Sequence, residues 1–110
     1  MVSQEDMNLI NQFQMFQQQL QAVMLQKEDN RLEIIEAEKA LDELSKSEVK
    51  EAYKITGHIM VKKDVNELKK WLEDKLSELE LRLSSLEKTE QKLNDKLKEM
   101  EPKVRKLLDQ

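Results

Sequence analysis

The 110-residue chain contains no cysteine, one glycine and one proline. Without cysteine it can form no disulfide, no thiolate zinc site and no cysteine nucleophile, which suits a reducing cell interior. One glycine and one proline are too few for the turns of a β-sandwich or of a compact α/β domain. A glycine-rich phosphate-binding loop is excluded for the same reason.

The composition is instead typical of long helices. Hydrophobic residues make up 38% of the chain and charged residues another 38%, with Glu, Lys and Leu abundant. The length allows one domain, which we expect to span residues 1–110. With 19 basic against 23 acidic residues, the chain gives no reason to expect a nucleic-acid partner.

The longest stretch without a charged residue is Met7–Gln26, and it is not a membrane span. It has twenty residues, but nine of them are Asn or Gln, which hydrocarbon would not tolerate. The amino terminus also lacks the basic start and cleavage site of a signal peptide. We therefore expect a soluble, cytoplasmic protein with no membrane partner.

A heptad pattern runs through the first part of the chain. The a positions are Phe13, Leu20, Lys27, Ile34 and Leu41, and the d positions are Leu9, Phe16, Val23, Asn30, Ala37 and Leu44. Nine of these eleven are apolar, which predicts the seam of a coiled coil. Lys27 and Asn30 interrupt the seam, and polar seam residues of this kind set the register of the two helices.

A second heptad pattern runs through the last part of the chain. Its d positions are Val65, Leu72, Leu79, Leu86, Leu93, Met100 and Leu107, and its a positions are Leu76, Leu83, Glu90, Leu97 and Val104. Only Glu90 is polar. The positions between them carry Glu, Lys and Asp, as expected of a solvated helix face.

The starts of both helices are marked by the spacing of a capping box, Ser3 with Asp6 and Asp64 with Glu67. The predicted helices therefore span residues 3–47 and 64–110. Each is about 65 Å long at 1.5 Å per residue, whereas a compact globule of this size has a radius of gyration of about 13 Å. The predicted fold class is mainly α, a long antiparallel two-helix coiled coil.

The segment between the helices, residues 51–63, predicts a short β-hairpin. It is rich in β-formers and turns at Gly57, where glycine supplies a positive φ. A lone two-stranded hairpin is marginally stable because both of its edges are open. We therefore expect hairpins of several subunits to assemble into an intersubunit sheet or β-barrel. The predicted oligomerisation residues are Tyr53, Ile55, Gly57, Ile59, Met60 and Val61.

The hairpin sequence YKITGHIMVK, residues 53–62, resembles the strand–Gly–strand signature of beta-type prefoldin subunits. The run FQMFQQQLQ at residues 13–21 is similar to the first helix of that family, and the runs at 79–83 and 90–93 are similar to its second helix. The resemblance covers almost the whole chain. One hairpin rather than two points to the beta type.

This resemblance implies a jellyfish-shaped hexamer of two alpha-type and four beta-type subunits, whose hairpins form a platform of β-barrels. It further implies an ATP-independent chaperone without cofactors, which binds unfolded or nascent polypeptides at the coiled-coil tips. Such a chaperone delivers its clients to a group II chaperonin. Pro102 departs from a regular second helix, and we expect the helix to kink or fray there.

The uncharged amino-terminal end is the candidate client-binding region. Met7 and Met15 fall outside the seam, and exposed apolar residues without nearby charges typify a binding surface. The alternative is that these apolar residues only pack the seam. The predicted client-binding residues, including those of the other chain end, are Met7, Leu9, Ile10, Phe13, Met15, Phe16, Met100, Val104, Leu107 and Leu108.

No residue pattern indicates catalysis, a cofactor or a metal. His58 is the only histidine and has no companions, so we interpret it as a turn residue. Trp71 lies close in sequence to the hairpin, and we expect it to pack against the platform. An alternative function is a coiled-coil tether or scaffold that oligomerises through its hairpin. Such a tether should have charged ends or one specific docking motif.

Overall fold

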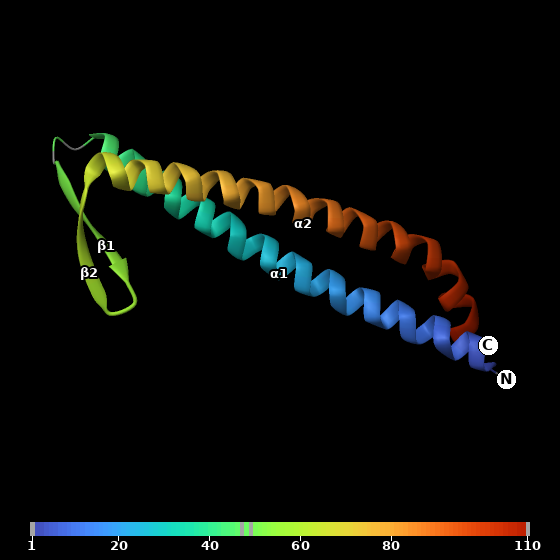
Figure 1. Ribbon diagram of the computed structural model, residues 1–110. Helices are drawn as coiled ribbons and strands as arrows, with labels where there is room; N and C mark the ends of the chain where they lie inside the picture. Colours follow the sequence, from blue (N-terminus) through green and yellow to red (C-terminus); the bar gives the residue numbers. More distant parts are fainter. Residues whose placement is uncertain (1, 47, 49, 110) are drawn as a thin grey trace. The chain divides into compact units, whose positions relative to one another are not determined.

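The computed structural model describes residues 2–46, 48 and 50–109, and it confirms the order helix, hairpin, helix (Figure 1). The elements are α1 (Gln4–Lys46), β1 (Glu51–Thr56), β2 (Ile59–Asp64) and α2 (Val65–Leu108). The predicted helix bounds at Ser47 and Gln110 lie outside the described residues. No helix in the part of the chain described is both long and apolar enough to cross a bilayer.

Both helices begin directly after the residues predicted to cap them. The Ser3 N–H donates to Asp6 Oδ2 and the Asp6 N–H donates to Ser3 Oγ, each at 3.1 Å. At the second helix, Asp64 Oδ2 accepts from the backbone N–H groups of Asn66 and Glu67, at 3.0 and 3.3 Å. Such caps satisfy the free donors of a helix start and contribute about 1 kcal/mol each.

The second helix continues through Pro102 to Leu108, so of the two outcomes expected at this proline, a kink or fraying, fraying does not occur. Proline removes the hydrogen bond to the Lys98 carbonyl, but the following turn is held by packing, since Val104 is only 4% exposed. The Asp109 N–H closes the helix on the Arg105 carbonyl at 3.0 Å. The last turns of α2, red in Figure 1, curve toward the first turns of α1, and a kink at Pro102 itself stays a prediction.

The described residues form two compact units. We call residues 2–29 with 84–109 the terminal unit, and residues 30–83 the hairpin unit. In the terminal unit, α1 and α2 are joined by an ion pair between Lys27 and Glu90. In the hairpin unit, Ala37 of α1 and Leu72 of α2 are buried and line one surface hollow together.

Every predicted seam residue is buried or half-buried, which confirms the coiled coil. The hairpin unit holds most of the buried seam, namely Asn30, Ile34, Ala37, Val65, Leu72 and Leu79. In the terminal unit only Leu93 and Val104 are buried, both on α2, and the α1 seam residues are half-buried. Leu68, just outside the predicted seam, is also buried.

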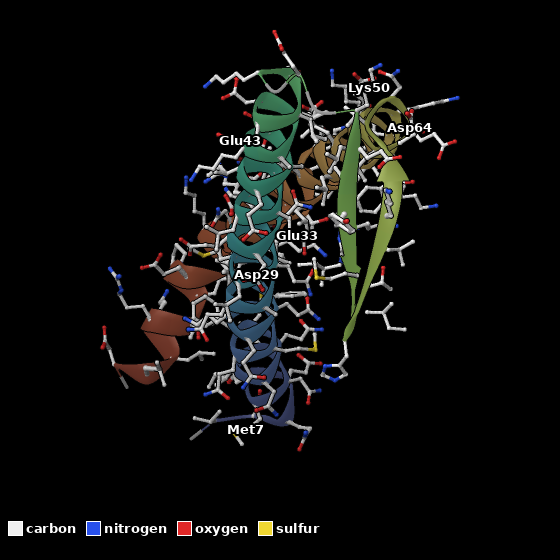
Figure 2. All side chains as sticks on the ribbon, turned by 90° about the vertical axis from the view of Figure 1, so that its left-hand side faces the viewer. Met7, Asp29, Glu33, Glu43, Lys50 and Asp64 are labelled. Atoms are coloured by element: carbon white, nitrogen blue, oxygen red, sulfur yellow. The ribbon has the colours of Figure 1, made fainter. Side chains whose placement is uncertain are left out.

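The hairpin closes with a two-residue turn. Thr56 pairs with Ile59 in antiparallel register, which leaves Gly57 and His58 as the central residues. Gly57 has φ of 60°, and it is the one residue of the described chain with a positive φ. Glycine with positive φ at the first central position fits the type II′ turn, whose twist matches that of the strands. Figure 2 shows Lys50 and Asp64 together at the other end of the hairpin, where the Val65 N–H donates to the Lys50 carbonyl.

The register divides the apolar residues of the hairpin between two faces. Directly opposed residues share a face, so Tyr53 and Ile55 lie on the same side as Met60, the partner of Ile55. Ile59 and Val61 lie on the other side with Lys54. The Lys54 ammonium lies 3.8 Å from the centre of the Trp71 ring, so this second face is turned toward α2.

Candidate functional site

The terminal unit exposes large apolar side chains on the first half of α1. Met7, Met15, Met24 and Leu25 are 47%, 45%, 52% and 67% exposed. Met7 lies in the first turns of the helix, at the lower end of α1 in Figure 2. At the other end of the chain Leu108 is 67% exposed. Residues 7–26 carry no charge, so Met7, Met15, Met24 and Leu25 are exposed on a stretch whose other polar residues are Asn and Gln, whereas Leu108 has charged neighbours in the sequence.

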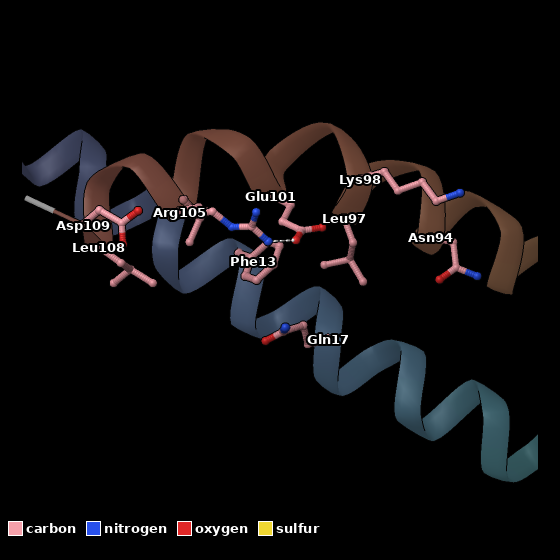
Figure 3. A pocket seen from close by; sticks show the side chains of 10 residues that line it. Phe13, Gln17, Asn94, Leu97, Lys98, Glu101, Arg105, Leu108 and Asp109 are labelled. Carbon is pink, nitrogen blue, oxygen red and sulfur yellow. Dashed lines mark hydrogen bonds and ion pairs between the residues drawn. The ribbon is translucent and has the colours of Figure 1, made fainter.

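A groove of 530 Å³ lies between α1 and α2 within this unit (Figure 3). Its apolar lining comprises Phe13, Leu97, Val104 and Leu108, and its polar lining comprises Gln17, Asn94, Lys98, Glu101, Arg105 and Asp109. We call it the terminal groove. Figure 3 shows Leu97 pointing from α2 toward α1, with Phe13 facing it from the other helix. This volume is within the range of about 300–1,000 Å³ that is usual for small-molecule sites, and it can hold one or two bulky side chains.

The charges at the groove are balanced among themselves. Arg105 donates to Glu101 one turn earlier on α2, so these two groups neutralise each other. Lys98 and Asp109 add one charge of each sign. The α1 side contributes only Phe13 and the amide of Gln17. The groove therefore favours an uncharged, largely apolar occupant.

The predicted client-binding residues occupy three different settings. Phe13, Val104 and Leu108 line the groove, although Val104 is only 4% exposed. Met7 and Met15 are exposed outside the groove. The remaining five, Leu9, Ile10, Phe16, Met100 and Leu107, are half-buried. Phe16 is additionally covered by Lys96, whose ammonium lies 4.9 Å from the ring centre.

Several groove residues were not identified from the sequence. The heptad pattern predicts Leu97 as a seam residue only, and it does not single out Gln17, Asn94, Lys98 or Glu101. The heptad pattern alone does not reveal them, because it gives the face of one helix but not the spacing between two. The hairpin unit likewise exposes Leu32, Ile35 and Leu81, at 55%, 47% and 74%, which the sequence analysis did not single out.

The polar residues of the seam do not all have the same setting. Lys27 Nζ contacts both carboxylate oxygens of Glu90, at 3.1 and 3.0 Å, and the two side chains are 17% and 23% exposed. This pair joins α1 to α2 in the terminal unit. Asn30, in the hairpin unit, is 4% exposed, and its Oδ1 accepts no hydrogen bond from the described residues.

The hairpin presents a second apolar surface. Tyr53, Ile55 and Met60 share one face and are 60%, 71% and 63% exposed. Both strands have one free edge, since the sheet contains only β1 and β2. Trp71 is 41% exposed and contacts the hairpin of its own chain through Lys54, while its packing against a platform of several subunits stays a prediction.

These features define a class of protein, a two-helix coiled coil joined by a β-hairpin with an apolar groove at the chain ends. A model of the family described as "Prefoldin subunit" matches residues 7–110. Prefoldin subunit beta of Thermococcus onnurineus is 43% identical over 91% of this chain and 87% of its own length. Prefoldin subunit beta of Archaeoglobus fulgidus is 36% identical over 92% and 88%.

The fold comparison agrees with these sequence matches. The crystal structure of the prefoldin beta subunit from Thermococcus strain KS-1 matches with a TM-score of 0.81 and 37% identity, covering 98% of this chain and 96% of that one. The chain therefore belongs to the prefoldin family, as one of its beta-type subunits. Prefoldins are chaperones of protein folding and not a family of enzymes.

Proposed function

We propose that this protein is an ATP-independent holding chaperone that binds unfolded or nascent polypeptides with its terminal unit. It acts in the cytoplasm as the beta-type subunit of a hexamer of two alpha-type and four beta-type subunits. It passes its clients to a group II chaperonin. Client contact involves the exposed methionines of α1 and the terminal groove.

The observation that carries this proposal is the groove beside an uncharged helix surface. Methionine side chains are flexible and polarizable, so they adapt to many different apolar partners. The groove offers apolar walls from both helices without a net charge. A binding surface of this kind does not select one sequence, as a chaperone for varied clients requires.

The hairpin supports assembly. An exposed face of Tyr53, Ile55 and Met60 together with two open strand edges is unfavourable for an isolated subunit. Pairing with the hairpins of neighbouring subunits would cover both the face and the edges. An alpha-type subunit, with its own hairpins, is the partner that the family membership suggests.

The test is suppression of aggregation of a chemically denatured, unrelated protein, with and without an alpha-type partner. We expect the assembled protein to suppress light scattering in the absence of nucleotide, and ATP with magnesium to have no effect. An assembly that left aggregation unchanged under both conditions would contradict a holding function and favour the tether or scaffold. Activity that required ATP would contradict the nucleotide-independent mechanism.

A further inference from the structure

The two amides that line the terminal groove, those of Gln17 and Asn94, lie outside the predicted seam positions. Gln17 is exposed on α1 and Asn94 is half-buried on α2. Within the described residues neither side chain is hydrogen-bonded to another group, whereas the nearby Gln91 amide donates to Asp95 at 2.9 Å. Figure 3 shows Asn94 directed from α2 toward α1, the helix that carries Gln17.

The chemistry of these two groups matches a peptide backbone. A side-chain amide has an N–H donor and a carbonyl acceptor, as does each peptide group. An unfolded chain has free backbone groups of both kinds, while in a folded protein most are paired within secondary structure. Uncharged amides also lose less hydration free energy on contact than carboxylates or ammonium groups do.

The charged side chains at the groove are not available to bind a peptide backbone in place of the two amides. Glu101 and Arg105 pair with each other, and the α1 side of the groove carries no charge at all. The apolar floor of Phe13, Leu97 and Val104 lies in the same groove as the amides. An occupant that inserts an apolar side chain would therefore bring its own backbone within the same groove.

We infer that Gln17 and Asn94 bind the main chain of an extended client segment whose bulky apolar side chain occupies the terminal groove. The inference rests on the proposed function and adds to it the feature by which non-native chains are selected. Hydrogen bonding to the backbone is independent of client sequence. It discriminates against native proteins because their backbone groups are already paired.

The test uses two fluorescent peptides with identical side chains, an unstructured Gly/Ser sequence with two central Phe residues. One has an ordinary backbone, and the other is N-methylated at the Phe positions and their neighbours. Binding to the assembled full-length protein is followed by fluorescence anisotropy. For the unmodified protein we expect about tenfold weaker binding of the methylated peptide, the loss of roughly two hydrogen bonds.

A double variant, Gln17→Leu with Asn94→Leu, should bind both peptides with nearly equal affinity. The matched control, Gln14→Leu with Gln18→Leu, changes two amides of α1 that do not line the groove, and it should retain the tenfold preference. Because every protein meets the same two peptides, the conformational effect of methylation cancels in this comparison. Circular dichroism of each variant checks that the coiled coil is intact.

If the double variant keeps the full preference, backbone recognition by these amides is wrong. The proposed function would still stand if that variant suppressed aggregation. If instead the occupant of the groove is a second copy of this chain, the peptides would not bind and the assembly mass would rise with concentration, which would also overturn the inference. Failure of the proposed function has a different signature, since the unmodified protein would then not suppress aggregation at all.

Discussion

The heptad patterns of both helices run through the terminal unit and the hairpin unit, but their apolar residues are buried to different depths in the two units. In the hairpin unit most of the seam is buried, with Ile34 and Leu72 each 9% exposed and Leu79 6% exposed. In the terminal unit the α1 seam residues, such as Phe13 and Leu20, are only half-buried. A tightly packed seam provides stability, whereas a partly open seam leaves apolar surface available to another chain.

The two units also differ in the surroundings of their exposed apolar residues. In the terminal unit Met7 and Met15 lie on a helix stretch without charges, while in the hairpin unit Leu32 and Ile35 lie between Arg31, Glu33 and Glu36. Exposure alone therefore does not define a binding surface. What distinguishes the terminal unit is the absence of charged residues from the α1 stretch 7–26 that carries its exposed methionines, and this can be tested directly.

We expect the largest effect of any substitution at the hairpin, where it should prevent assembly with other subunits. Ile55→Asp places a carboxylate on the face shared by Tyr53 and Met60, and an unpaired charge in a buried layer costs several kcal/mol. We expect loss of the assembly with an alpha-type partner, measured by analytical ultracentrifugation. Ile59→Asp, on the face turned toward Trp71, should weaken assembly less.

The control for this experiment is Leu81→Asp, since Leu81 is 74% exposed against 71% for Ile55 but lies on α2. It introduces the same charge in the same unit and should leave the mass of the assembly unchanged. An Ile55→Asp protein that still assembled fully would contradict the hairpin platform.

The second prediction separates client binding from assembly. Changing Met7, Ile10, Met15 and Leu108 to Ser removes apolar surface from the terminal unit but touches no seam position. Changes at the exposed Met7, Met15 and Leu108 usually alter stability by no more than about 0.5 kcal/mol each, and the change at the half-buried Ile10 should cost about 1 kcal/mol. We expect most of the aggregation suppression to be lost while the assembly mass stays constant.

A matched variant changes Leu32, Ile35 and Leu81 to Ser in the hairpin unit. These residues are about as exposed, at 55%, 47% and 74%, but they have charged neighbours. Aggregation suppression should persist in this variant. Equal loss of activity in both variants would show that the charge-free setting is irrelevant and that clients contact the whole arm.

The elements of this fold that depend on local sequence could be predicted. The caps at Ser3 and Asp64, the seam positions and the turn at Gly57 follow from residues within one or two helical turns. Fraying at Pro102 does not occur, because the lost hydrogen bond is a local feature whereas the burial of Val104 depends on the partner helix.

Features that depend on two elements at once were not predicted. The division of the hairpin residues into two faces requires the register, which places Ile55 with Met60 but Val61 with Lys54. The terminal groove requires the separation of α1 and α2, which heptad counting does not give. The polar residues that line it, such as Gln17 of α1 and Asn94 of α2, therefore cannot be identified from the sequence.

The third prediction compares the depth of burial in the two units with one type of substitution. Leu72→Ala, in the mostly buried seam of the hairpin unit, should lower the free energy of unfolding by about 2–4 kcal/mol. Leu20→Ala, in the half-buried seam of the terminal unit, should lower it by about 1–2 kcal/mol. Urea denaturation followed by circular dichroism measures both at one fixed protein concentration, because assembly adds to stability. Equal losses would show that the terminal seam is as tightly packed as the other.

The smallest effect concerns the ion pair of the terminal unit. Lys27→Met leaves the Glu90 carboxylate, only 23% exposed, without the ammonium that contacts both of its oxygens. We expect a loss of about 1–2 kcal/mol, because a part-buried charge without a partner keeps its desolvation cost. Adding Glu90→Leu removes that charge and turns the polar layer into an apolar one, so the double variant should regain most of the loss.

The exposed pair of Asp42 and Lys46, 58% and 68% exposed, provides the control. Lys46→Met should change the free energy of unfolding by less than about 0.5 kcal/mol, since exposed pairs are solvated and weak. If the losses from Lys27→Met and Glu90→Leu simply add in the double variant, the two groups are not coupled. The Lys27–Glu90 pair would then add no interaction free energy, and the register of α1 on α2 would depend on apolar packing alone.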